Sequence, residues 1–340
     1  MTYRSKAPLR IGLAGGGTDV SPYCDWYGGA IVNATISLYA YASIEPISEA
    51  KIILEAHDRK ETVFFDLQPE LPINGELDLL KSVCNCIQND YGPLPHGIRL
   101  STFVDVPAGS GLGTSSTLVV AIVGAFAEML ALPLSKYAIA HYAYHIERNY
   151  LHWVGGRQDQ YAATFGGINF MEFYNGEKVT VNPIRLSHDY LLELENNLLL
   201  YYTATSRNAE NIIKQQAANV HNQVKESVEA MHELRQQAHG MKEALLNGQL
   251  DQLGEILDDG FRQKRKMASG ISNELIEAIY KTAKRAGATG GKISGAGGGG
   301  FMLFYCPGTT KYAVIESLQK FGGHHKHYNF VGRGLTTWNT

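Results

Sequence analysis

A short segment rich in glycine and hydroxyl residues, 107–117, is the part of this sequence best suited to chemistry. Its glycines lie between a strand-like run at 98–106 and an apolar run at 118–130, which is long enough for a helix. The free N–H groups in the first turn of a helix bind anions, and the helix dipole strengthens that attraction. The hydroxyl groups of Thr114, Ser115 and Ser116 can add hydrogen bonds or a ligand for Mg²⁺. The segment therefore predicts a phosphate-binding loop.

Two common phosphate-binding patterns are absent from this segment. No lysine follows the last glycine, so the G-x-x-x-x-G-K-[ST] pattern is not formed, and the segment contains no G-x-G-x-x-G. Because short glycine motifs often match by chance, a glycine-rich helix start capped by a threonine remains the alternative interpretation.

The elements that must position this loop form an α+β pattern in the first half of the chain. Strands are grouped with helices there, instead of alternating one by one, which favours an α+β layer over a regular βαβ repeat. The predicted strands are residues 10–14, 30–44, 52–56, 62–66, 98–106, 167–174 and 179–181, and the predicted helices are 76–90, 117–130 and 136–149.

The second half is dominated by helices, and its boundary is expected near Asn182 and Pro183, which gives domains 1–182 and 183–340. Apolar residues spaced by three and four predict one helical face. They are Ile213, Ala217, Val220, Val224, Val228 and Met231. The other predicted elements are a strand at 198–203, helices at 250–266, 273–286 and 311–321, a strand–turn–strand over 292–306 and a last strand near Tyr328.

The glycine-rich turn at 294–300 does match G-x-G-x-x-G, through Gly295, Gly297 and Gly300. A strand-like run, 301–306, follows it, whereas a dinucleotide site requires a helix at that point. The turn is therefore either a tight hairpin or a loop whose glycines allow it to pack against phosphates bound by the other domain.

The composition gives no sign of a nucleic-acid or membrane partner. The net charge is −3 and charged residues make up 19% of the chain, so no strongly basic surface is expected. The longest apolar run, 118–127, is too short to span a bilayer, and the N-terminus has no apolar signal region. We therefore expect a cytoplasmic protein, as a monomer or a homodimer.

Cysteine and histidine spacings do not indicate a zinc site or a disulfide framework. The four cysteines form no C-x-x-C pair. His141 and His145 are four residues apart with Glu147 beyond them, but the H-E-x-x-H order is absent, so we expect structural or surface histidines.

Three segments, taken together, resemble the GHMP kinases, a family named for galactokinase, homoserine kinase, mevalonate kinase and phosphomevalonate kinase. Residues 107–116 resemble the family's nucleotide-phosphate loop, Pro-x-x-x-Gly-Leu-Gly-Ser-Ser-Ala, with Thr114 and Ser116 as departures. Residues 6–10 and the pair Thr18–Asp19 resemble its first motif, Ala-Pro-Gly-Arg ending in Thr-Asp, and residues 294–300 resemble its third. The three motifs occur in the family's order across almost the whole chain.

The resemblance implies a two-domain fold, with an N-terminal domain like domain 2 of ribosomal protein S5 and a C-terminal ferredoxin-like α/β sandwich. It also implies ATP as the phosphate donor, bound by the phosphate loop. The residues expected to bind it are Pro107, Gly109, Ser110, Gly111, Leu112, Gly113, Thr114, Ser115 and Ser116.

The resemblance further implies roles for three charged residues and a serine. In the family a Glu upstream of a G-x-x-D motif coordinates Mg²⁺, so Glu147 and Ser115 would be the metal ligands, with Ser116 as the alternative hydroxyl. Asp159 would be the catalytic carboxylate, and Arg10 would be a fixed cation beside it. Without the resemblance, composition favours Glu147 and Asp159 as surface charges or helix caps, and Arg10 could be an ordinary cation at a strand end.

Asp19 would accept hydrogen bonds from sugar hydroxyls, or it could cap a turn. Galactokinases have Gly-Glu-His-Thr-Asp where this chain has glycine at 15, 16 and 17 before Thr18 and Asp19. The loss of a carboxylate opens volume and removes negative charge, which suits a sugar with a phosphorylated tail. The expected substrate-binding residues are Lys6, Gly16, Gly17, Thr18, Asp19, Arg207, Lys292, Gly297 and Gly298, with Lys6, Arg207 and Lys292 as partners for that phosphate.

Within the family, segments 5–10, 15–19 and 156–160 most resemble the bacterial D-glycero-D-manno-heptose 7-phosphate kinases. The implied reaction is ATP-dependent phosphorylation of the anomeric hydroxyl, giving the 1,7-bisphosphate for the synthesis of nucleotide-activated heptose. The alternatives are a kinase for an unphosphorylated sugar such as L-fucose or galactose, and a catalytically inactive sugar sensor. Retention of Asp159, Glu147 and Arg10 argues against the sensor.

Overall fold

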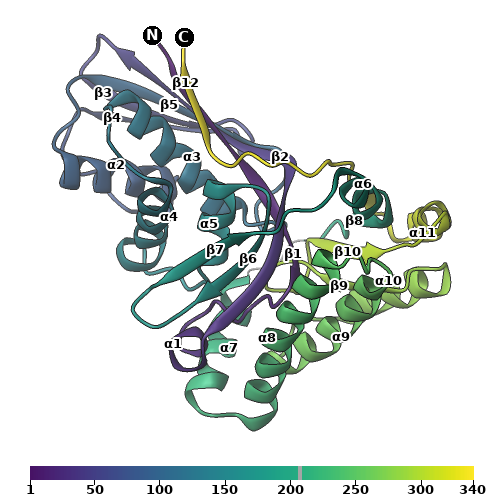
Figure 1. Cartoon of the computed structure of the whole chain (residues 1–340). Coiled ribbons are helices and arrows are strands. Elements are labelled where there is room, and N and C mark those ends of the chain that lie inside the picture. The colour runs from purple at the N-terminus through teal and green to yellow at the C-terminus, as the bar shows by residue number, and fades with distance from the viewer. Residues whose placement is uncertain (206–208) are drawn as a thin grey trace.

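The computed structural model describes residues 1–205 and 209–340, and within them the strands form one eight-stranded and one four-stranded sheet (Figure 1). The large sheet has the order β12-β1-β2-β5-β3-β4, and β6 and β7 extend it from β2. Its strands are β1 (Tyr3–Ala14), β2 (Gly29–Ile47), β3 (Lys51–Ala56), β4 (Glu61–Asp66), β5 (Gly97–Val104), β6 (Ile168–Phe173), β7 (Val179–Pro183) and β12 (Thr336–Asn339).

The central strands β1 and β2 connect the two halves of the molecule. At its start β1 pairs with β12, so the two termini lie side by side (Figure 1). Its register with β2 shifts between Pro8 and Arg10 and again between Gly12 and Ala14. Such irregularities redirect a strand and free N–H groups from the ladder. The N–H of Arg10 instead donates to the carbonyl of Leu112, which fixes the phosphate loop to β1.

Helices of the first half cover one face of the large sheet. They are α2 (Asp78–Tyr91), α3 (Thr114–Met129), α4 (Lys136–His145) and α5 (Gln158–Phe165), and the short α1 (Tyr23–Tyr27) lies between β1 and β2 in the chain. The central helix α3 packs against β1 and β2 and buries Val119, Ile122 and Phe126 completely, which fixes the start of the helix in space.

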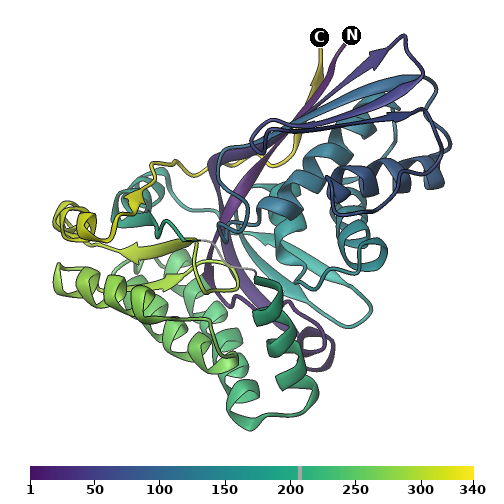
Figure 2. The same cartoon turned by 180° about the vertical axis from the view of Figure 1, so that it is seen from behind.

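The second half places helices on both faces of a small antiparallel sheet, of order β11-β8-β10-β9. In the view from behind, the longest of these helices lie below the strands (Figure 2). The strands are β8 (Leu198–Tyr202), β9 (Gly290–Ile293), β10 (Phe301–Tyr305) and β11 (His324–His325). The helices are α6 (His188–Asn197), α7 (Ala209–His221), α8 (Lys225–Leu246), α9 (Gln252–Met267), α10 (Glu274–Arg285) and α11 (Thr310–Leu318).

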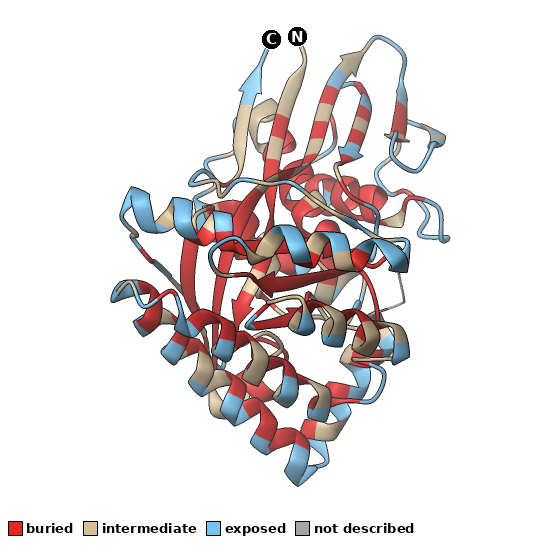
Figure 3. Cartoon of the chain, turned by 90° about the vertical axis from the view of Figure 1, so that its right-hand side faces the viewer, coloured by how far each residue is buried: buried red, intermediate tan, exposed pale blue. Residues whose placement is uncertain are grey.

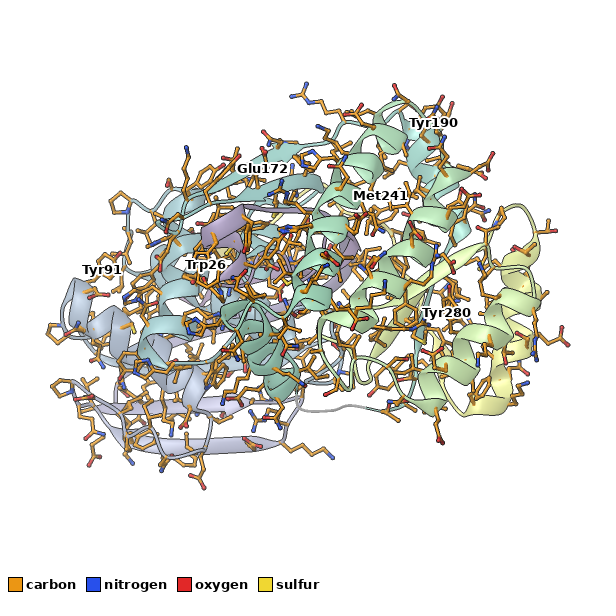
Figure 4. All side chains as sticks on the ribbon, turned by 90° about the horizontal axis from the view of Figure 1, so that it is seen from below. Trp26, Tyr91, Glu172, Tyr190, Met241 and Tyr280 are labelled. Atoms are coloured by element: carbon orange, nitrogen blue, oxygen red, sulfur yellow. The ribbon has the colours of Figure 1, made fainter. Side chains whose placement is uncertain are left out.

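Helix α8 joins the two halves, because it packs against β1 and β2 as well as against α9. Met241 of α8 is fully buried between them (Figure 4). One cluster of buried apolar residues extends from the large sheet through α8 to the small sheet, and Figure 3 shows buried segments in both halves. The two halves thus share one extended apolar core.

Several sequence predictions about the second half are wrong in detail. The apolar face over residues 213–231 belongs to two helices, because the chain turns between α7 and α8 at Gln223, which has a φ of 53°. Helix α6 and strand β12 were not predicted, and neither was α5 in the first half. The strand expected near Tyr328 is absent from the described residues around it, where β11 lies earlier and one isolated bridge joins Ile36 to Phe330.

The predicted division at residue 183 does not separate the two sheets cleanly. β7 ends at Pro183 and the next strand belongs to the small sheet, but β12 returns to the large sheet. No helix among the described residues combines the length and the apolar character that crossing a membrane requires.

Candidate active site

An ion pair between the buried Arg10 and the partly exposed Asp159 forms the centre of the site. Arg10 lies on β1 beside the first register shift, and its Nε donates to Oδ1 of Asp159 over 2.6 Å. Its Nη1 donates to the carbonyl of Gly111 over 2.7 Å. Asp159 lies in the first turn of α5, and a Cβ on Gly113 would be only 3.0 Å from its carboxyl carbon. The ion pair is therefore packed directly against the phosphate loop.

The phosphate loop ends where α3 begins. Gly113, with a φ of 79°, precedes the helix, and among the described residues no side chain caps the first turn. The N–H groups of Thr114, Ser115 and Ser116 belong to that turn, where an α-helix provides no acceptor for them. An anion at this position would accept these hydrogen bonds and interact favourably with the helix dipole.

The glycine turn at 294–300 supports the phosphate loop from the second half. The hydroxyl of Ser294 donates to the carbonyl of Gly111 over 2.9 Å, and the N–H of Phe301 donates to the carbonyl of Ser110 over 2.9 Å. A Cβ on Gly300 would lie 2.3 Å from the Ser110 carbonyl oxygen, so the two backbones pack directly against each other. The turn therefore contacts the loop directly, and Gly295 also lines the cavity beside the loop, so the approach of this turn to bound phosphates stays a prediction.

Two adjoining cavities meet at the ion pair. The loop cavity is lined by Gly109, Gly111, Gly113, Thr114, Ser115, Ser116 and Glu147. The lysine cavity is lined by Gly16, Asp19, Gln158, Lys264 and Lys292. Arg10, Asp159, Gly156 and Gly295 line both. A group held at the ion pair can thus be reached from both cavities.

A third, more apolar cavity adjoins the loop cavity. Leu77, Leu79, Leu80, Val104, Val106 and Leu118 line it, and Thr114, Ser115 and Trp153 are shared with the loop cavity. Sequence reasoning missed Trp153, because nothing in the local pattern shows that the segment after Tyr150 passes over the start of α3. An apolar pocket beside a phosphate-binding helix start fits an aromatic base.

Asp19 lies almost completely buried in the lysine cavity. Its Oδ2 accepts hydrogen bonds from the N–H groups of Arg157 (2.8 Å) and Gln158 (3.0 Å). A Cβ on Gly156 would overlap this carboxylate, so that position has room only for glycine. Burial raises the pKa of the Asp19 carboxyl, the N–H of Gln158 lowers it, and the charge of Asp159 raises it. Near it, Oε1 of Gln158 is buried without a hydrogen-bond partner among the described residues and can accept one from a ligand.

Arg157 holds the turn that carries both carboxylates, and sequence reasoning missed this role. Its guanidinium is buried and donates to Asp25 Oδ1 over 2.7 Å, to Ser21 Oγ over 3.2 Å and to the carbonyl of Tyr174 over 2.8 Å. Its main chain donates to Asp19, and α5 with Asp159 begins at the next residue. Arg157 thus ties the α1 region and β6 to the start of α5.

Two buried lysines from the second half reach the lysine cavity. Lys264 of α9 donates to the carbonyl of Gly295, and Lys292 of β9 donates to the carbonyl of Gly12 over 3.0 Å. Among the described residues, neither ammonium group forms an ion pair with a carboxylate within 4.0 Å. Burial lowers the pKa of Lys264 to about 8, with Arg10 contributing, and burial, Lys264 and Arg10 lower that of Lys292.

The sequence predicted Lys292 and missed Lys264. A signal for Lys264 was present, because it follows Leu253, Leu257 and Phe261 at helical spacing and therefore lies on the apolar face of α9. A lysine on such a face is unusual unless it is paired or functional.

Glu147 and Ser116 are linked by the amide of Gln160, which donates to Glu147 Oε2 over 2.5 Å and to Ser116 Oγ over 3.1 Å. Glu147 is 2% exposed and lies in a π-helical turn, Ile146–Tyr150, that continues α4. Such turns are frequent at functional sites. One buried carboxylate and one hydroxyl facing a phosphate-binding loop form a donor set of hard oxygens, which fits Mg²⁺. Ser115 also lines the loop cavity, but its side chain is exposed and is not part of this linked group.

Several predicted site residues do not reach the cavities. Lys6 lies over the ring of Tyr39 at 4.8 Å, on the part of β1 that pairs with β12. Thr18 is buried and holds the turn, with its hydroxyl donating to the carbonyls of Gly15 and Ala30. Arg207 lies outside the described residues.

Three of the predicted substrate-binding glycines have roles in packing and backbone conformation. A Cβ on Gly297 would lie 2.7 Å from the carbonyl oxygen of Ile271, and the N–H of Gly298 donates to that carbonyl. Gly17, with a φ of 103°, does line the lysine cavity, but a Cβ there would meet Met267 and Gln216, so backbone conformation and packing require glycine at this position.

Three residues of the predicted phosphate loop also have supporting tasks. The side chains of Ser110 and Leu112 are fully buried, while Pro107 is exposed, and none of the three lines the loop cavity. The carbonyls of Ser110 and Leu112 instead accept the hydrogen bonds that attach the loop to β10 and β1.

A fixed cation–carboxylate pair between a phosphate-binding helix start and a polar cavity defines a phosphotransferase site. The family model for the N-terminal domain of GHMP kinases matches residues 78–167, and the model for the C-terminal domain matches residues 241–324. The chain is also similar to a D-glycero-alpha-D-manno-heptose 7-phosphate kinase from Campylobacter jejuni, at 45% identity over 99% of both chains. The chain belongs to the GHMP kinase family.

Two further relatives place the chain within that family. A crystal structure described as a D-glycero-D-manno-heptose 1-phosphate kinase from Bacteroides thetaiotaomicron superposes with a TM-score of 0.85 at 41% identity, over 99% of each chain. An L-fucokinase/L-fucose-1-P guanylyltransferase from Bacteroides fragilis is 27% identical over 97% of this chain, which covers 37% of that protein. The likeness to the two heptose kinases is the greater.

Proposed function

We propose that the chain transfers the γ-phosphoryl group of ATP to the anomeric hydroxyl of D-glycero-D-manno-heptose 7-phosphate, giving the 1,7-bisphosphate and ADP. The observation that carries this proposal is the Arg10–Asp159 pair, which lies between the loop cavity and the lysine cavity. ATP would occupy the loop cavity with its base in the apolar cavity, and the sugar would occupy the lysine cavity. The name of the 45% identical relative supports the choice of sugar.

Asp159 is placed to orient the attacking hydroxyl. Its carboxylate accepts the hydrogen bond of the anomeric hydroxyl and takes the proton as the bond from this oxygen to the γ-phosphorus forms and the bond to the β-phosphate oxygen breaks. Arg10, fixed by Asp159 and Gly111, offsets negative charge near the transferring group. Asp19 accepts hydrogen bonds from other sugar hydroxyls, and the buried Oε1 of Gln158 accepts another.

The N–H groups at the start of α3 bind the phosphates of ATP. Glu147, with Ser116 or Ser115, would hold Mg²⁺, which neutralises phosphate charge when it is bound. The link through Gln160 favours Ser116 as the hydroxyl ligand. The cytoplasmic location and the oligomeric state stay predictions.

A substrate panel tests this proposal. The purified chain is assayed with ATP and heptose 7-phosphate, L-fucose, galactose and mannose 6-phosphate, and kcat/KM is measured for each. We expect the highest value for heptose 7-phosphate. A higher value for fucose or galactose would favour a kinase for unphosphorylated sugars, and no turnover with any sugar would favour a sensor.

A further inference from the structure

We propose that Lys264 and Lys292 form the binding site for the phosphate group that the sugar carries before the reaction, and that this pair selects phosphorylated over unphosphorylated sugars. The inference rests on the proposed function, and it adds which residues bind the tail of the sugar. Lys264 comes from α9 and Lys292 from β9, so the second half of the chain provides this subsite.

The two ammonium groups lie close to one point in the lysine cavity. A Cβ built on Gly16 would lie 3.9 Å from Nζ of Lys292 and 4.0 Å from Nζ of Lys264. Both lysines line the same cavity as Asp19 and Gln158, which are placed for sugar hydroxyls. A phosphate group beside Gly16 would therefore face both cations while the sugar ring extends toward Asp159.

The charges of the lysine cavity are unbalanced without a ligand. Arg10, Lys264 and Lys292 provide three cations, whereas Asp19 and Asp159 provide two carboxylates among the described lining residues. Asp159 is paired with Arg10, and Asp19 accepts two main-chain N–H groups. Buried cations without a counter-ion are unfavourable, and the lowered pKa of both lysines reflects this cost. A bound phosphate group would provide negative charge that more than offsets this excess of one positive charge.

The γ-phosphate of ATP is a less suitable ligand for this pair. The loop cavity, where the helix start binds phosphates, is not lined by either lysine. Lys264 donates a hydrogen bond to the carbonyl of Gly295, a residue that lines both cavities. Arg10 is the cation that faces both of them.

The test compares Lys264→Met and Lys292→Met with the wild-type enzyme on heptose 7-phosphate. A charge-assisted hydrogen bond to a buried partner contributes enough that KM for heptose 7-phosphate should rise at least about 30-fold in each variant, with a smaller change in kcat. The KM for ATP should stay within about 3-fold, because neither lysine lines the loop cavity. The selectivity for heptose 7-phosphate over the same heptose without phosphate should fall by a similar factor.

Lys311→Met is the matched control. Lys311 also donates to main-chain carbonyls, those of Glu195 and Asn196, but it lines neither cavity. This variant should keep wild-type KM values. Thermal unfolding of all three variants shows whether they are folded, and a variant that unfolds early is replaced by the corresponding Lys→Gln.

Gly16→Glu and Gly16→Gln provide a second test that leaves both lysines in place. The carboxylate would reach the two ammonium groups and occupy the phosphate subsite, whereas the amide adds similar bulk without charge. We expect Gly16→Glu to raise KM for heptose 7-phosphate several-fold more than Gly16→Gln does.

The outcomes separate this inference from the proposed function. If the wild-type enzyme shows no preference for the phosphorylated sugar, both are overturned. If the wild type prefers heptose 7-phosphate and both lysine variants keep that preference, the inference alone is overturned. A loss of kcat with an unchanged KM for heptose 7-phosphate would also overturn it, because the lysines would then act on the transferring group.

Discussion

Asp19 and Asp159 lie in one cavity, and their surroundings fit them for different tasks. Asp19 is almost fully buried and bonded to main-chain N–H groups, so it is a rigid acceptor. Asp159 keeps 23% of its side chain exposed and is bonded to Arg10, so one oxygen can face a substrate. Rigid acceptors suit positioning, and an accessible carboxylate suits proton transfer.

Asp159→Asn should lower kcat on the order of 10³-fold, because an amide cannot take the proton of the attacking hydroxyl. Binding of ATP and sugar, measured by isothermal titration, should change little, since the amide keeps the size of the side chain. Turnover near the wild-type value would remove Asp159 from its role.

Lys264 should impose an alkaline limit on catalysis. Burial lowers its pKa to about 8, with Arg10 also lowering it and Asp19 raising it, and Lys292 and Asp159 face the same cavity. As pH rises through about 8 the free enzyme loses this charge, so kcat/KM for the phosphorylated sugar should fall. The kcat should fall less, because a bound phosphate dianion favours the charged lysine. An identical alkaline limb in Lys264→Met would contradict this assignment.

Glu147→Gln should weaken binding of the divalent cation, because a neutral amide is a poorer ligand for a hard cation than a carboxylate. The measurement is the titration of Mn²⁺, followed by electron paramagnetic resonance, with a non-hydrolysable ATP analogue bound. We expect the dissociation constant to rise at least about 10-fold. An unchanged titration by a folded variant would sink the assignment of Glu147 as a ligand.

At the scale of elements, the start of α5 determines the geometry of the site. Arg157 precedes this helix, and its contacts with Asp25 and Tyr174 hold the turn against α1 and β6. Asp25 itself lines neither cavity. Asp25 can therefore affect activity only by holding this turn in position.

Asp25→Asn should weaken the ion pair with Arg157 and loosen the N–H groups that hold Asp19. We expect KM for the sugar to rise about 10-fold while KM for ATP stays near the wild-type value. Steady-state kinetics with each substrate varied in turn provide the measurement. Equal changes in both KM values would instead indicate general loss of structure.

The sequence predicted the parts of the site that lie in continuous motifs. The loop at 107–116, Arg10, Asp19 and Asp159 each lie within such a segment, and the structure brings them together. Arg157 and Lys264 could not be identified in this way, because their roles depend on which elements pack against α5 and α9. Strand β12 was missed because a short strand is recognised only together with its partner strand. The break between α7 and α8 was missed because the apolar spacing continues across the turn at Gln223.

At the scale of the whole molecule, the site lies where the two halves meet. The first half provides Arg10, Asp19, Asp159 and the phosphate loop, and the second half provides Lys264 and Lys292. The long strand β1, which pairs with β12 at one end and has Gly12 bonded to Lys292 near the other, holds these parts in register. Because the two halves share a core through α8, this arrangement depends on both of them.

The most direct test of the account is the structure of the product. The wild-type enzyme is incubated with ATP and heptose 7-phosphate, and the product is examined by phosphorus and carbon NMR. We predict a second phosphate ester on the anomeric carbon, with the 7-phosphate retained and one ADP formed for each sugar consumed. A new phosphate on any other carbon, or ADP formed without a new sugar ester, would contradict the proposed reaction.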